Sequence, residues 1–157
     1  MRYFIVILLS LYSLANVPSY NDLCKSMSEV ENFKSSECDG SNIKSPMGEF
    51  VSATKDYKQK DKFIEVSIMS GNMAATAWMP FVMGVSIETN DTIIKIDKIN
   101  GFKAGINFNK KDKSGAIVLK LSDDAVVSFN FEKMKLDEVL EIVKKYDVKK
   151  IKKLFKK

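Results

Sequence analysis

The side chains that could carry out acid–base or metal chemistry are few in this chain of 157 residues, because it contains no histidine. Without imidazole, Ser-His-Asp triads, Cys-His pairs and histidine-ligated metals are excluded. The carboxylates of Asp123-Asp124 and Asp137-Glu138 are adjacent in sequence, and neighbours on a strand or helix do not converge on one substrate. The sequence therefore predicts a protein that is not an enzyme and that has no metal site and no cofactor.

Cys24 and Cys38 are the only two cysteines of the chain. Two thiols cannot form a four-thiolate zinc site, and the spacing is not the Cys-x-x-Cys of a redox motif. In an oxidising compartment such a pair predicts one structural disulfide, with two free thiols as the alternative.

The N-terminus has the pattern of a secretory leader. Arg2 precedes an apolar run over residues 4–15, which is shorter than the ~20 residues of a membrane-spanning helix. We expect a signal peptide over residues 1–19, with cleavage after Ala15 or Ser19; an uncleaved anchor or a buried N-terminal strand is the alternative. The leader predicts a periplasmic or secreted protein.

The strongest charge feature is the C-terminal end, where residues 144–157 hold eight lysines and one acid in a chain of net charge +5. The candidate residues for binding an anionic surface are Lys144, Lys145, Lys149, Lys150, Lys152, Lys153, Lys156 and Lys157. They either bind anionic lipid headgroups or envelope polymers, or solvate the outer face of terminal helices.

Arg2 is the only arginine, which argues against nucleic-acid binding, because lysine lacks the planar fork that reads guanine and phosphate.

Methionines gather around a small-residue segment that predicts a short buried helix. The candidates for an apolar groove beneath this helix are Met69, Met73, Trp78, Met79 and Met83. Methionine suits adaptable apolar pockets, and thioethers one helical turn apart can bind Cu(I). Plain core packing is the simpler interpretation of the same spacing.

The elements that position these residues follow from the hydrophobic pattern. Residues 20–47 predict a short amphipathic helix on Leu23, Met27, Val30 and Phe33, and then a turn-rich loop. Residues 48–157 predict a domain with strands at 50–57, 63–68, 92–99, 102–108, 116–121 and 125–131 and helices at 136–145 and 149–155. The predicted fold is α+β: an antiparallel β-sheet meander packed on one face by helices, with a short disulfide-tied N-terminal segment.

The order of these motifs resembles known proteins. Tyr57 is followed by residues 61–68, a small-residue helix, residues 99–104, residues 114–118 and a final helix. This pattern is similar to small exported bacterial proteins of uncharacterised function, and it loosely resembles PsbP-like domains and the extracellular sheet-plus-helix domains of anti-sigma proteins. The resemblance covers residues 50–155 and implies a fold; it brings no catalytic residue.

Together these features predict a non-enzymatic exported protein that acts as a binding or interaction module at the cell envelope. Its expected partner is an anionic membrane surface or an envelope protein. The alternative is a carrier of a small apolar ligand, held between the sheet and the methionine-rich helix.

Overall fold

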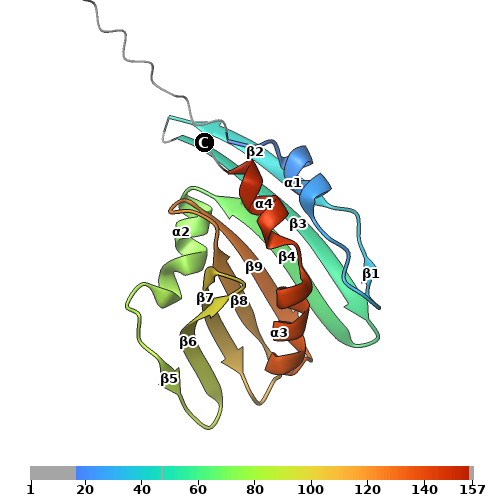
Figure 1. The fold of residues 1–157 in the computed structure, drawn as a ribbon, viewed down its shortest axis with the longest axis vertical. Coiled ribbons are helices and arrows are strands. Elements are labelled where there is room, and N and C mark those ends of the chain that lie inside the picture. Colours follow the sequence, from blue (N-terminus) through green and yellow to red (C-terminus); the bar gives the residue numbers. More distant parts are fainter. Residues whose placement is uncertain (1–16, 47, 156–157) are drawn as a thin grey trace, which may run out of the picture.

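The computed structural model describes residues 17–46 and 48–155 (Figure 1). Most of the predicted signal peptide, and Lys156 and Lys157 of the lysine-rich end, lie outside these residues. The strands are β1 (Lys34–Ser35), β2 (Asp39–Ser45), β3 (Gly48–Gln59), β4 (Lys62–Ser70), β5 (Ile87–Glu88), β6 (Thr92–Ile99), β7 (Phe102–Asn109), β8 (Ser114–Lys120) and β9 (Ala125–Glu132). The helices are α1 (Tyr20–Ser26), α2 (Asn72–Trp78), the 3-10 turn η1 (Met79–Phe81), α3 (Leu136–Lys145) and α4 (Val148–Leu154).

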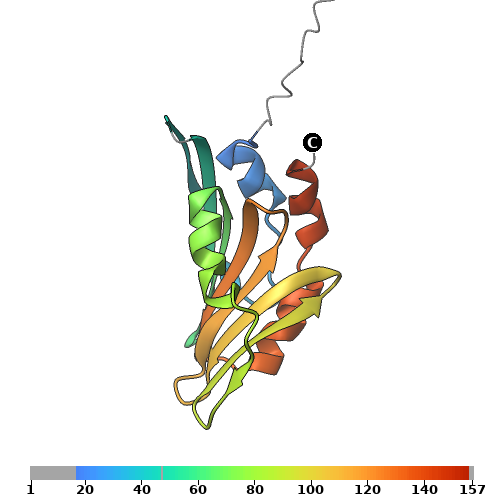
Figure 2. The same ribbon diagram turned by 90° about the vertical axis from the view of Figure 1, so that its left-hand side faces the viewer.

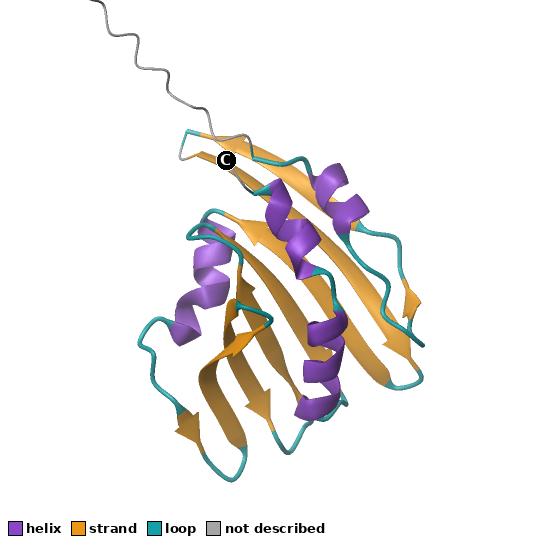
Figure 3. Cartoon of the chain, in the orientation of Figure 1, coloured by secondary structure: helices purple, strands orange, loops and turns teal. Residues whose placement is uncertain are grey.

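All nine strands belong to one antiparallel sheet, in the order β1-β3-β4-β9-β8-β7-β6-β5, and β2 also pairs with β3. Strands β6 to β9 form a meander of three consecutive hairpins, as predicted. After β4 the chain crosses to the far edge of the sheet through α2 and β5, and the meander then returns to pair β9 with β4 (Figure 3).

The two faces of the sheet carry separate hydrophobic cores. Along β8, Ile117 and Leu119 point into the larger core, which α1, α3 and α4 cover, whereas Val118 points to the opposite face. There it packs with Ala74 and Trp78 of α2 (Figure 2). The predicted α+β class is confirmed, and among the described helices α2 lies on the second face, together with the 3-10 turn η1.

Two local predictions in the N-terminal segment are wrong. The helix expected on Leu23, Met27 and Val30 ends at Ser26, and Met27 and Val30 enter the core from an irregular segment instead. The turn-rich stretch expected as a loop contains β2, whose residues pair in register with β3 from Asp39↔Thr54 to Ser45↔Gly48. Its serine, glycine and asparagine residues have weak strand propensity, but the long β3 offers backbone partners over its whole length.

Candidate functional site

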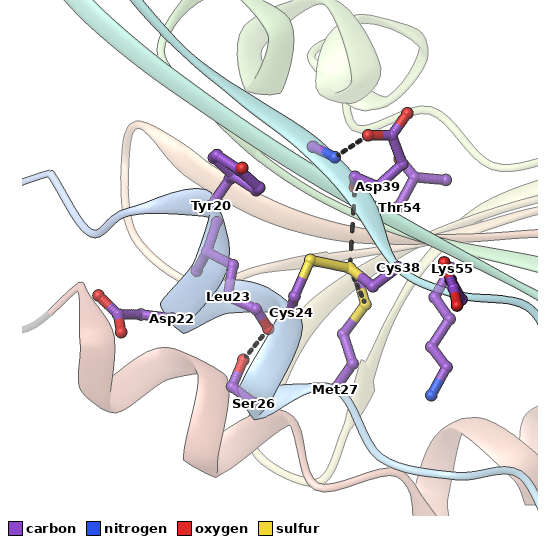
Figure 4. Close-up of a disulfide and its surroundings, with 12 residues drawn as sticks. Tyr20, Asp22, Leu23, Cys24, Ser26, Met27, Cys38, Asp39, Thr54 and Lys55 are labelled. Carbon is purple, nitrogen blue, oxygen red and sulfur yellow. Dashed lines mark hydrogen bonds between the residues drawn. A yellow bond between two sulfur atoms is a disulfide. The ribbon is translucent and has the colours of Figure 1, made fainter.

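The N-terminal segment is fixed to the sheet by a disulfide between Cys24 and Cys38 (Figure 4). The two Cα atoms are 5.7 Å apart, and Met27 Sδ lies 3.7 Å from Cys38 Sγ. The bridge joins α1 to the start of β2, and α1 in turn contacts α4, where Lys150 Nζ donates to the carbonyl oxygen of Lys25 at 3.2 Å. The predicted disulfide is therefore confirmed, and it holds a helix that supports the C-terminal one.

A buried tyrosine pair joins the N-terminal segment to the junction of α3 and α4. Tyr57 Oη donates to the carbonyl oxygen of Ser28 at 2.6 Å, and the Ser28 N–H donates to Tyr146 Oη at 3.1 Å. The two hydroxyl oxygens are 3.2 Å apart, and the Tyr146 ring packs edge-on against Phe129. Burial raises the pKa of Tyr146 to about 12 and the pKa of Tyr57 further. Both hydroxyls stay protonated near neutral pH, which suits a structural link between distant segments.

The lysines of α4 lie on the outer side of the helix, because its apolar residues pack against the core on the inner side. Val148 and Ile151 are buried in the main core, so the lysines between and after them face outward. We call the following residues the lysine surface: Lys144, Lys145, Lys149, Lys150, Lys152 and Lys153. The structure thus brings together all the predicted candidates that it describes.

Few carboxylates neutralise the lysine surface. Lys144 forms an ion pair with Glu141 at 2.8 Å, and this hydrogen bond lowers the pKa of Glu141 and raises that of Lys144. In the described part of the chain no carboxylate lies within salt-bridge distance of the lysines of α4 itself. Asp147 caps α4 by accepting from the N–H of Lys150 at 3.1 Å. The surface therefore keeps most of its positive charge.

The space beneath α2, where the sequence predicts an apolar groove, is filled. Trp78 is 8% exposed and packs against the sheet with Phe81, whose ring lies so close to Gly105 that a Cβ there would meet it at 2.3 Å. Met69 is partly buried in the same cluster. Met73, Met79 and Met83 instead point outward, so they do not line a groove between helix and sheet.

These methionines belong to a larger exposed feature, although the sequence pattern predicts a short buried helix here. No charged residue occurs in residues 71–87, which we call the apolar segment. Its exposed large side chains are Met73, Met79, Val82, Met83, Val85 and Ile87. Pro80 and the short 3-10 turn end α2 early, so the later methionines do not continue along its buried side. These side chains form the main group of exposed large hydrophobic residues in the described part of the chain.

A hollow of about 520 Å³ lies beside α3, and no local sequence pattern predicts it, because its residues come from distant segments. Its lining combines apolar residues with four glutamates: Val30, Phe33, Ile142, Glu29, Glu31, Glu138 and Glu141. Three of these glutamates pair with lysines, as Glu29–Lys55, Glu138–Lys62 and Glu141–Lys144. The hollow has the size of a small-molecule site, but most of its charge is neutralised by the protein itself.

The described residues contain neither a group of metal ligands nor a membrane-spanning helix. Within residues 17–46 and 48–155, no three His, Cys, Asp or Glu side chains are grouped as metal ligands would be. No helix in the same part of the chain is long and apolar enough to cross a membrane.

Comparison with protein-family models, curated proteins and solved structures finds no match for this chain. The resemblance to PsbP-like and anti-sigma domains therefore stays a prediction from the sequence pattern.

Proposed function

We propose that this protein is a non-enzymatic, exported binding module of the cell envelope, periplasmic or secreted, that attaches to anionic membrane headgroups through the lysine surface. The apolar leader pattern supports export, and a disulfide is compatible with an oxidising compartment. The observation that carries the attachment is that α4 turns four lysines outward with no carboxylate paired to them among the described residues.

The lysine surface has a rigid support, which lowers the cost of presenting it. Helix α4 is held to the core by its buried Val148 and Ile151. It also contacts α1, which the disulfide ties to β2, and the tyrosine pair lies just before its first residue. Each lysine near an anionic membrane contributes about 1 kcal/mol at physiological ionic strength. Four such lysines are enough for reversible attachment. Because salt screens these charges, the attachment should weaken as the salt concentration rises.

Carriage of a small apolar ligand is the alternative function. Trp78 and Phe81 fill the space beneath α2, so the observation that favours a carrier is the hollow beside α3. A carrier would take up an apolar dye at high salt, and a bulkier side chain at Ile142 would then prevent uptake.

The attachment is tested by flotation of the purified protein with vesicles that contain anionic lipid, across a salt series. The variant Lys149→Gln/Lys153→Gln removes two exposed charges of α4 and leaves its buried residues intact. We expect about thirtyfold weaker binding at low salt, from two contributions of about 1 kcal/mol each.

A matched control removes two exposed lysines elsewhere. Lys111→Gln/Lys133→Gln changes the net charge equally, at the β7–β8 turn and after β9, on the end of the molecule away from α4 (Figure 1). This control should bind nearly as the unmodified protein does. Equal loss in both variants would mean that net charge alone drives binding, and absence of binding at low salt would refute the proposal.

A further inference from the structure

One sequence motif outside the lysine surface lies in the turn between β5 and β6. Residues Asn90-Asp91-Thr92 match Asn-x-Ser/Thr with a residue other than proline in the middle, which is the acceptor motif for N-linked sugars. It is the only such match in the sequence. Glu88, two residues before Asn90, extends it to Asp/Glu-x-Asn-x-Ser/Thr, the longer form that periplasmic oligosaccharyltransferases recognise. Both forms of the motif therefore select the same asparagine.

The structure leaves this asparagine accessible. Asn90 and Asp91 are the exposed central residues of a tight turn, which the Thr89 N–H closes by donating to the carbonyl oxygen of Thr92 at 2.8 Å. Lys110 donates only to backbone oxygens of this turn, those of Thr89 and Asp91. Among the described residues, the Asn90 carboxamide and the Thr92 hydroxyl take part in no hydrogen bond. The two groups that a transferase must reach are therefore free.

The turn belongs to a weakly held edge of the sheet. Strand β5 is only two residues long, and it pairs with β6 through Ile87↔Ile94 and Glu88↔Ile93. Both residues of β5 are exposed, and they belong to neither hydrophobic core. Segments with few buried contacts open locally at a low cost in free energy. A transferase can therefore bind residues 88–92 as an extended segment while the rest of the sheet stays folded.

We propose that Asn90 is the acceptor of an N-linked oligosaccharide, transferred from a lipid-linked donor after export. The Asn90 amide nitrogen forms a bond to the anomeric carbon of the sugar, while the bond from that carbon to the pyrophosphate oxygen breaks. The electron pair of that bond leaves with the lipid pyrophosphate, and the amide nitrogen gives up one proton. The transfer rests on the export in the proposed function but not on the membrane attachment. The β5–β6 turn lies at the end of the molecule away from α4, so a sugar there leaves the lysine surface uncovered (Figure 1).

Intact mass spectrometry of the full chain tests the proposal. The chain, with its leader, is produced in a bacterial host that carries a periplasmic oligosaccharyltransferase and its lipid-linked oligosaccharide, and it is recovered from the periplasm. We expect a mature chain whose mass exceeds that of the polypeptide by one oligosaccharide. In the same host without the transferase, the mature chain should have the mass of the polypeptide alone.

Variants of the motif assign the added mass to one residue. Asn90→Gln and Thr92→Ala should each abolish it, whereas Thr92→Ser should keep it because serine supplies the same hydroxyl. Glu88→Gln should lose most of it, because the longer motif requires an acidic residue there. The matched control is Asn72→Gln, which changes an exposed asparagine outside the motif and should keep the full added mass.

The outcomes separate this proposal from the proposed function. A mature chain that has lost its leader but carries no added mass would overturn the proposal and leave export intact. A chain that keeps its leader in the cytoplasm would refute export, and the transfer with it. Added mass that survives Asn90→Gln would also overturn the proposal, since the sugar would then be attached elsewhere.

Discussion

The buried tyrosine pair predicts that the protein loses stability at alkaline pH over a defined window. An unfolded tyrosine ionises near pH 10, whereas burial raises the pKa of Tyr146 to about 12 in the folded protein. Between these values the unfolded state gives up the proton and the folded state keeps it, so a rise in pH favours unfolding. The stabilisation is complete below pH 10 and is lost by about pH 12.

The size of this effect follows from the shift. At pH 11, one unit above the unfolded pKa, Tyr146 alone should lower the free energy of unfolding by about 1.4 kcal/mol, and Tyr57 acts in the same direction. In the Tyr146→Phe variant, the part of this decrease in the free energy of unfolding that comes from Tyr146 disappears. The same variant should be less stable at pH 8 by about 1–3 kcal/mol, because the N–H of Ser28 loses its acceptor.

Urea unfolding followed by circular dichroism at pH 8 and pH 11 measures both effects. Tyr20→Phe is the matched control, because the Tyr20 hydroxyl takes no part in the Tyr57–Tyr146 contact. The free energy of unfolding of this variant should fall between pH 8 and pH 11 by as much as that of the unmodified protein. The lysines are the same in all three proteins, so the comparison isolates the tyrosine hydroxyl. If Tyr146→Phe loses as much stability between pH 8 and pH 11 as the unmodified protein does, the tyrosine pair is not the cause.

Two further predictions concern the supports of the two surfaces. Cys24→Ser/Cys38→Ser should lower the free energy of unfolding by about 3 kcal/mol, measured by urea unfolding, and addition of a reductant should do the same to the unmodified protein but not to the variant. Gly105→Ala places a methyl group against the Phe81 ring and should cost about 1–3 kcal/mol. That cost should nearly vanish in a Phe81→Ala background; an unchanged cost there would mean that backbone strain, and not the ring, opposes the methyl group.

The sequence predicted the regular parts of the fold well, because local patterns determine them. In β4 the alternation of Ile64, Val66 and Ile68 with polar residues fixes which side faces the core. Short polar turns then join successive strands into hairpins, and the apolar stripe of α3 gives its bounds and its buried residues Val139 and Val143. The cysteine spacing was also sufficient to predict the disulfide, given export.

The predictions that failed depend on partners distant in sequence. Strand β2 has a composition typical of turns, and it exists because β3 extends far enough to pair with it. The methionines after Trp78 have the spacing of core residues, but the chain turns at Pro80 and leaves them exposed.

The sequence by itself determined the class of fold, the disulfide and the charge of the C-terminal end. These follow from composition and from periodicity within a few residues, where strand and helix geometry leave little choice. Only the tertiary structure decided that Tyr57 meets Tyr146, that Trp78 fills the space under α2, and that the apolar segment and the lysine surface lie on different sides of the sheet. The physical reason is that long-range strand pairing, here β4 with β9, sets which segments meet, and no local pattern records it.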